Sequence, residues 1–319
     1  MDFDDLFVCP ECADALTAEW SCRACAKSFR QSDGVPDLRA AVDPGTERVR
    51  EFYERSPFPA YPPRDSLEWL RARAERSEFA RMLDRAVPGD ATIVEVGCGT
   101  GQMSLYLSRA GRRLVGADLA RASLRLAAGA ARRFGLERAV RFIQTDLHRP
   151  GLRSGAFDVV YSSGVLHHTP DPSAAFAQIV PLARPGGWIV VGLYNAFARI
   201  PLRVRRVVAR MSGYRWTLFD PVLRDRTHEP ARREAWLRDQ YQHPTEHRHT
   251  LGEVQRWFAA NDVEYVRTYP SALLASESDE LFSHCGDAWA PEQWLAQLAW
   301  IKALGHEGGL FVTVGRRRA

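Results

Sequence analysis

The stretch IVEVGCGTG, residues 93–101, decides the fold. It opens with β-branched apolar residues typical of a buried parallel strand, interrupted only by Glu95. Gly97, Gly99 and Gly101 then stand at every second position, a spacing that indicates close approach of the backbone to a ligand. Residues 102–110 carry apolar side chains that predict a helix. Strand, glycine turn and helix together predict half of a doubly wound α/β sheet, with a ligand at the carboxyl end of the strand.

The glycine spacing indicates which ligand to expect. A dinucleotide site needs G-x-G-x-x-G, whereas the third glycine here comes one residue early, as G-x-G-x-G. With Glu95 two residues before the first glycine, the motif resembles that of class I S-adenosylmethionine (SAM)-dependent methyltransferases. In that family the loop holds the amino acid and sulfonium end of the cofactor. The resemblance implies a cofactor site at Glu95, Gly97, Cys98, Gly99 and Gly101.

Four further strands follow in the order of that family, at residues 113–117, 140–144, 157–161 and 188–193. Asp118 ends the first of them, where a carboxylate can accept both ribose hydroxyls of an adenosine. Asp146 follows the next, where the family places an acid against the adenine amino group. The resemblance adds Leu119, Leu147 and Ser163 to the cofactor site. The alternative is that both aspartates only cap strand ends.

The remaining elements complete the expected sheet. Residues 263–269 and 309–315 predict the sixth and seventh strands, the seventh antiparallel at the edge. Residues 67–86 predict one amphipathic helix, with a buried stripe of Trp69, Leu70, Phe79, Met82 and Leu83. Thr250 and Glu253 form a capping box that starts a helix over 250–261. The fold class is therefore α/β: a Rossmann-like, seven-stranded, mostly parallel sheet.

Composition narrows the class of protein. The chain has 319 residues, of which 45% are hydrophobic, enough for one α/β domain and a small module. No apolar run approaches the roughly 18 residues of a membrane span, and the acidic N-terminus does not resemble a signal peptide. We therefore expect a soluble, cytoplasmic protein with no membrane partner. A net charge of +4 is too small to indicate nucleic-acid binding.

Four of the six cysteines lie within the first 25 residues, as Cys9-x-x-Cys12 and Cys22-x-x-Cys25. Two such pairs supply the four thiolates of a closed, structural zinc site. Two disulfides or a redox dithiol are the alternatives, and a reducing cytosol disfavours the first. Residues 29–38 resemble the end of a Trm112-type zinc ribbon, a module often fused to or partnered with methyltransferases. Cys98 and Cys285 are interpreted as structural.

The domain organisation follows from these assignments. We expect a zinc ribbon over residues 1–39, a linker at 40–47 and a methyltransferase domain over 48–319. Residues 49–63 form an aromatic, proline-rich strap whose Tyr53, Phe58 and Tyr61 either line the cofactor pocket or pack on the sheet. Two insertions, 195–249 and 270–308, are longer than a simple domain requires and are expected to form a lid that selects the substrate.

Two stretches of the first insertion carry charge. Residues 198–211 hold five arginines and no acid, which indicates a grip on an anionic substrate or on RNA. The alternative is a helix that packs Ile200, Val204, Val207 and Val208 and exposes its arginines to water. Residues 239–249 concentrate ionisable groups in a helix-poor stretch, where His243, Glu246, His247 and His249 would form a metal site or orient substrate.

Methyl transfer from a sulfonium is an in-line displacement, so alignment and exclusion of water are the protein's main tasks. A general base is needed only for a nucleophile that starts protonated. His167 and His168 follow the fourth strand and are the first candidates, with Tyr194 and His243 next. The His-His pair also occurs widely in small-molecule methyltransferases of different substrates, where one of the two is often structural.

Three functions remain open. The first is methylation of oxygen, nitrogen or carbon in a small, possibly anionic metabolite, in bacterial specialised metabolism. The second is an RNA methyltransferase, although the ribbon carries more acids than basic residues. The third is a non-catalytic binding partner, which the complete glycine loop and both acids disfavour. The sequence does not indicate the oligomeric state.

Overall fold

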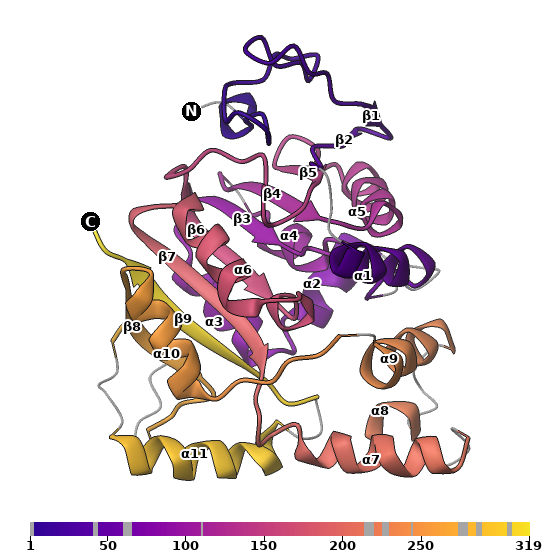
Figure 1. Ribbon diagram of the computed structural model, residues 1–319, viewed down its shortest axis with the longest axis vertical. Helices are drawn as coiled ribbons and strands as arrows, with labels where there is room; N and C mark the ends of the chain where they lie inside the picture. The colour runs from indigo at the N-terminus through magenta and orange to yellow at the C-terminus, as the bar shows by residue number, and fades with distance from the viewer. Residues whose placement is uncertain are drawn as a thin grey trace.

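The computed structural model describes residues 3–40, 44–59, 66–109, 111–213, 220–224, 230–243, 245–273, 280–284, 289–304 and 308–319. A seven-stranded sheet of order β5-β4-β3-β6-β7-β9-β8 runs through it (Figure 1). Its strands are β3 (Thr92–Val96), β4 (Arg113–Asp118), β5 (Val140–Gln144), β6 (Phe157–Ser163), β7 (Ala183–Tyr194), β8 (Val263–Tyr269) and β9 (Leu310–Arg317). The first five are parallel to one another, and β9 is antiparallel to both its neighbours. The predicted fold class is confirmed.

The lateral position of the last strand differs from the prediction. β9 pairs with β7 along its length, from Trp188↔Arg316 to Tyr194↔Leu310, and with β8 on its other side. β8 is therefore the edge strand, and the prediction that the seventh strand lies at the edge is wrong. Hydrophobic periodicity identifies a strand but does not give the order of strands, because that order depends on long-range pairing.

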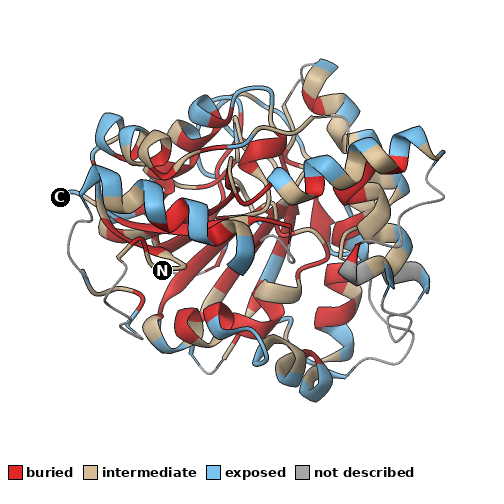
Figure 2. Ribbon diagram, turned by 90° about the horizontal axis from the view of Figure 1, so that it is seen from below, coloured by how far each residue is buried: buried red, intermediate tan, exposed pale blue. Residues whose placement is uncertain are grey.

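Helices cover both faces of the sheet. α3 (Glu78–Ala86), α4 (Gln102–Leu107) and α5 (Arg121–Arg133) pack into the core on one face. α6 (Pro172–Ile179), α10 (Leu251–Ala260) and α11 (Ala290–Ala303) pack into the core on the other. Figure 2 shows buried residues following the strands between these layers. Because a parallel sheet is covered on both sides, all five residues of β3 are buried.

Several helix boundaries differ from those predicted. Residues 67–86 form two helices, α2 (Leu67–Ala74) and α3, because the Ser77 side chain accepts a hydrogen bond from the Ala80 N–H at 3.3 Å and begins a new helix. Trp69, assigned to the buried stripe, is 37% exposed. α1 (Pro44–Arg55) includes the end of the predicted linker and the start of the strap, and α4 ends before Ala110, which lies outside the described residues. The capping box of α10 is confirmed.

The cysteine-bearing segment lies at one end of the molecule, and α7 (Ile200–Met211) and α11 lie at the other (Figure 1). This segment contains the short helix η1 (Asp4–Leu6) and the hairpin β1 (Gln31–Ser32) and β2 (Val35–Pro36). The Leu38 N–H donates to the Gln144 carbonyl at the edge of β5, at 2.8 Å. Phe7 is buried in the same core cluster as the sheet. The cysteine-bearing segment therefore packs directly on the sheet.

The first insertion, after β7, folds into α7, α8 (Pro221–Arg224) and α9 (Pro230–Gln242). The second insertion contributes α11, between β8 and β9. The remaining elements are two single turns, η2 (Leu166–His168) and η3 (Val180–Leu182). The stretch 239–249, predicted to be helix-poor, has its first four residues in α9.

Helix α5 receives its N-terminal cap from another helix, because its own N-cap residue, Ala120, has no side-chain oxygen. The Glu54 carboxylate of α1 accepts hydrogen bonds from the backbone N–H groups of Arg121, at 2.6 Å, and Ala122, at 3.0 Å. We predict that Glu54→Ala lowers the free energy of unfolding by about 1–2 kcal/mol, because two orphan donors and the helix dipole lose their carboxylate. Urea unfolding measures it.

The matched control is Glu51→Ala, on the same helix, whose side chain is half-exposed and pairs only with the exposed Arg55. We expect it to change the free energy of unfolding by less than about 0.5 kcal/mol. Equal losses in the two variants would show that the cap on α5 contributes nothing.

Candidate active site

A cavity of about 550 Å³ opens at the carboxyl ends of the parallel strands. Most of the predicted site residues line it: Glu95, Gly97, Cys98, Gly99, Asp118, Leu119, Asp146, Leu147, Ser163, His168 and Tyr194. Three others do not line it. Gly101 caps α4 against Phe142, and His167 and His243 lie behind the cavity wall.

The loop requires glycine at positions 97 and 99, because other chain segments lie directly against its backbone there. Gly97 and Gly99 have φ angles of +76° and +52°, in the left-handed region that favours glycine. A Cβ on Gly97 would clash with the Val165 side chain, and one on Gly99 with the Phe58 carbonyl oxygen. The strap thus lies directly against the loop, and Tyr53 and Phe58 line the cavity, which is the first of the two alternatives for the strap. Tyr61 lies outside the described residues.

Two carboxylates, the buried Glu95 and the half-buried Asp118, face the cavity beside this loop. Asp118 accepts hydrogen bonds from the backbone N–H groups of Gly99, at 2.7 Å, and Ala120, at 2.8 Å. Glu95 accepts one from the Ser104 hydroxyl. Burial raises the pKa of both carboxyl groups, that of Glu95 to about 8. Among the described residues neither forms an ion pair with a protein cation. A ligand that brings an ammonium group and hydroxyl donors would satisfy both.

A second polar cluster lines the cavity opposite the loop, and it joins the strap to α9. The Tyr53 hydroxyl donates to Asp239 Oδ1 at 2.9 Å. Gln240 Nε2 lies 2.7 Å from Asp239 Oδ2 and 2.8 Å from the Tyr194 hydroxyl oxygen. Asp239 and Gln240 are both 4% exposed. The sequence interpretation named neither as a site residue, because they come from an insertion. The density of ionisable groups in 239–249 was the available signal.

Three histidine rings, those of His167, His168 and His243, pack against one another at one wall of the cavity. His168 lines the cavity, and its Nδ1 lies 2.8 Å from the Thr245 carbonyl oxygen. A carbonyl only accepts, so Nδ1 carries the proton and Nε2 is left as a proton acceptor. Burial lowers the pKa of His168 to about 4 and that of His243, whose ring lies 3.7 Å away, to about 3. His167 is fully buried, with its ring 3.8 Å from that of Tyr194.

Arg199 is the largest fully buried side chain of the described residues. Its guanidinium lies 3.5 Å from the centre of the Tyr194 ring and 2.7 Å from Glu246 Oε2. It also donates to Gln240 Oε1 and to the Gly308 carbonyl, each at 2.5 Å. A fixed cation thus holds the wall of the cavity together.

This contact reverses the predicted packing of α7. Arg199 and Arg206 face inward onto Glu246, whereas Val204 and Val207 are 60% and 57% exposed. The alternative in which the valines pack and the arginines are solvated is therefore wrong for Val204 and Val207 and for Arg199 and Arg206, whereas Arg203 and Arg210 are exposed. The sequence interpretation did not detect that Glu246 would supply the counter-charge, because it lies 47 residues away.

Comparison with known proteins adds family information to this geometry. Residues 94–191 match the sequence model of a family described as a methyltransferase domain. That range runs from β3 to β7 and contains the glycine loop and Asp118. This region, about a third of the chain, is therefore similar to a methyltransferase domain.

Relatives extend beyond the methyltransferase domain with lower similarity. An uncharacterized protein of Synechococcus sp. is 26% identical over 278 residues, covering 76% of this chain and 66% of the relative. A ubiquinone biosynthesis O-methyltransferase of Bordetella avium is 32% identical over 132 residues, covering 40% of this chain and 48% of the relative. The chain therefore spans about half the length of this methyltransferase.

Solved structures share the fold of the methyltransferase domain at low identity. A [4+2]-cyclase, SpnF, superposes with a TM-score of 0.51 and 16% identity, covering 88% of this chain and 99% of that one. A geranyl diphosphate C-methyltransferase of Streptomyces coelicolor superposes with a TM-score of 0.50 and 17% identity, covering 87% and 100%. Because one of these is named a cyclase, the fold alone does not decide the reaction.

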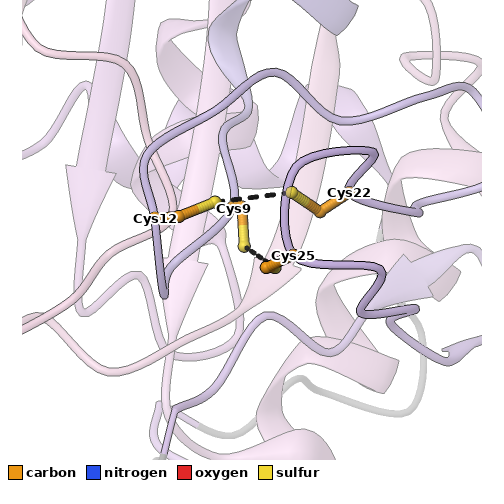
Figure 3. A group of neighbouring side chains, drawn as sticks. All are labelled: Cys9, Cys12, Cys22 and Cys25. Atoms are coloured by element: carbon orange, nitrogen blue, oxygen red, sulfur yellow. Dashed lines mark hydrogen bonds between the residues drawn. The ribbon is translucent and has the colours of Figure 1, made fainter.

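The structure brings the four predicted cysteine ligands together but does not bring the predicted histidine ligands together. The Sγ atoms of Cys9, Cys12, Cys22 and Cys25 all lie within 4.8 Å of one another (Figure 3). Within the described ranges, this is the only group of three or more such ligands close enough to share an ion. The alternative metal site at residues 243–249 is therefore not formed, because Glu246 is held by Arg199 and Arg206.

The buried histidines predict a pH dependence of stability. An unfolded histidine has a pKa of about 6.5, above the folded values of about 4 for His168 and about 3 for His243. The unfolded chain then binds more protons, so stability rises with pH from about 4 to about 6.5 and is lost as pH falls through that window. Each unit of difference corresponds to roughly 1.4 kcal/mol. Urea unfolding between about pH 5 and pH 7.5 measures the slope.

His243→Asn separates this effect from general acid sensitivity. We expect the variant to have a shallower slope, whereas His284→Gln, at an exposed histidine, keeps that of the wild type. An unchanged slope in His243→Asn would contradict the assignment.

Proposed function

We propose that this protein transfers a methyl group from SAM to a small-molecule acceptor inside the cavity. The observation that carries the proposal is the pair of carboxylates, the buried Glu95 and the half-buried Asp118, beside a glycine loop in the region that matches the methyltransferase family. Glu95 suits the cofactor's ammonium group, and Asp118 suits the ribose hydroxyls. Leu119, Asp146 and Leu147 line the same cavity and suit the adenine.

When bound, SAM supplies an electrophilic methyl group on a positively charged sulfur. The chain's own residues then align the acceptor and exclude water. Helices α1 and α9 meet over the cavity through the Tyr53–Asp239 hydrogen bond and through Arg238, which donates to the Ser56 hydroxyl at 2.6 Å. In this proposal α1 and α9 form the lid. Only α9 belongs to one of the two insertions from which a lid was expected.

The proton of the acceptor goes to His168 in this proposal. Its Nε2 is the unprotonated nitrogen, and a pKa of about 4 keeps the ring neutral at pH 7. A weak base of this kind suffices when the acceptor becomes strongly acidic as the methyl group arrives. Tyr194 and Asp239 hold the acceptor through the hydroxyl and carboxylate that border the same space. His167 and His243 position His168 by packing.

The arrangement of the arginines favours a small acceptor over RNA. Arg199 and Arg206 are bonded to Glu246, and Arg205 lies 3.6 Å from Asp220, so these arginines are not presented to a phosphate backbone. The predicted grip on an anionic substrate loses support for these three arginines, whereas Arg203 and Arg210 are exposed on the outer surface. Oxygen, nitrogen and carbon acceptors remain equally compatible with the cavity.

Calorimetric titration with S-adenosylhomocysteine (SAH) tests the cofactor site. We expect Asp118→Asn to weaken SAH binding by at least about tenfold, since it removes an acceptor for the ribose hydroxyls. Asp158→Asn is the matched control: this carboxylate also accepts from a backbone N–H, that of Thr92 at 2.7 Å, but at the opposite ends of the strands. It should leave the affinity unchanged. Absence of SAH binding to the wild-type protein would overturn the proposal.

We also propose that the four clustered cysteines hold a structural Zn²⁺ ion. The Cys9–Cys25 and Cys12–Cys22 sulfur distances are 3.6 and 3.4 Å. A tetrahedral site with Zn–S bonds of about 2.3 Å separates its sulfurs by about 3.8 Å, whereas a disulfide would bring two of them to about 2.05 Å. The spacing thus supports four thiolates around one ion, as the sequence predicts.

Zinc content measured by mass spectrometry tests the ribbon site. The wild-type protein should carry about one Zn²⁺ per chain, and Cys12→Ser with Cys22→Ser should reduce this to near zero, because only two thiolates remain. Cys98→Ser, in the glycine loop, should retain the metal. Zinc that follows Cys98 rather than the cluster, or a wild-type protein without zinc, would contradict the assignment.

A further inference from the structure

One end of the molecule exposes an unusual concentration of large apolar side chains. Ten such residues are exposed in the described part of the chain, and eight of them lie on α7 and at α11. We call this set the apolar face: Ile200, Val204, Val207, Met211, Trp289, Trp294, Leu295 and Leu298. Exposed apolar residues scattered singly need no explanation, but a contiguous group indicates a binding surface.

The apolar face is built by regular helical spacing. In α7, positions 200, 204, 207 and 211 share one side of the helix, opposite Leu202 and Ala209, which are buried against Tyr241 of α9. The Arg199–Glu246 ion pair and the packing on Tyr241 together fix which side of α7 faces inward, so the apolar stripe lies on the outside. Met211 is 84% exposed, so the stripe continues to the end of the helix.

The two helices form one surface. Figure 1 shows α7 and α11 along the same lower edge of the molecule, and in the view from below both face the reader (Figure 2). Their ends are joined by the Phe197 and Trp294 rings, 5.2 Å apart, and by Asn195 Nδ2, which donates to Gln297 Oε1 at 3.0 Å. The apolar residues are therefore held in fixed positions on one side of the protein.

Basic residues flank the apolar face, and α11 carries one acid, Glu292, in its first turn. Arg203 and Arg210 are exposed on one flank of the α7 stripe, and Lys302 is exposed at the end of α11. Arg248, in the segment after α9, is also exposed. α7 contains no acidic residue. An apolar helix face with tryptophan and basic flanks matches the boundary layer of an anionic membrane.

We propose that the apolar face docks the protein on the surface of a bilayer that contains anionic lipids. No helix in the described segments has the length and apolarity to cross a bilayer, but interfacial docking needs only an apolar stripe with cations beside it. A second copy of this chain fits less well, because it would present the same basic residues and α7 has no acid to pair with them. Membrane docking revises the expectation of no membrane partner, which rested on spanning segments alone.

Flotation with vesicles tests the docking surface independently of methyl transfer. Wild-type protein should float with vesicles of phosphatidylcholine and phosphatidylglycerol, and less with phosphatidylcholine alone, because the cations contribute. The variant Val204→Gln, Val207→Gln, Leu298→Gln should lose at least about tenfold in partitioning, since three exposed apolar groups no longer leave water. Arg203→Gln with Arg210→Gln should lose only the preference for phosphatidylglycerol.

Two controls come from elsewhere on the surface. Trp69→Gln and Leu126→Gln alter the other two exposed large apolar residues, on α2 and α5, and should float as the wild type does. SAH affinity and the unfolding midpoint of the triple variant report whether it is folded. Wild-type protein that floats with neither vesicle, or a folded triple variant that floats like the wild type, would overturn the proposal. The proposal would also be overturned if the wild-type protein forms a dimer, the triple variant does not, and neither protein binds vesicles.

Discussion

The ion pair between Arg199 and Glu246 is the contact on which the function-bearing half of the molecule depends. A guanidinium with no exposure to water is stable only when its charge and donors are matched, and here a carboxylate, an amide, a carbonyl and an aromatic face do so. These partners come from β7, α9, the segment after α9 and the segment before β9. One residue therefore ties both insertions to the end of β7.

The same contact shapes two surfaces at once. On its inner side, it fixes Tyr194 and Gln240, and through Gln240 it holds the Asp239 carboxylate at the cavity wall. On its outer side, Arg206 of α7 joins Arg199 on Glu246, so Val204 and Val207 face the surroundings. Because α7 has a fixed order of side chains, one choice of inward face decides both what lines the cavity and what the protein presents outside.

The methyltransferase domain and the insertions differ in how far sequence predicts them. The glycine loop, Glu95 and Asp118 could be predicted because their signals are local. Closely spaced glycines indicate positive φ angles, and an acid at the end of an apolar run indicates a carboxylate at a strand end. All seven strands and the capping box of α10 were predictable for the same reason. In contrast, His167 and His168 look equivalent in sequence, yet of these two only His168 lines the cavity. Which histidine does so depends on residues 77 positions away.

By itself, the sequence determined the α/β class, the cofactor-type loop with its acids and the cysteine quartet, because each rests on short-range patterns of period, turn geometry or ligand spacing. Tertiary structure alone decided the position of β9 inside the sheet, the meeting of α1 with α9 over the cavity and the inverted packing of α7. Each of these depends on partners far apart in the chain. A buried charge takes whichever counter-charge the fold brings to it, and hydrophobic periodicity does not report that choice.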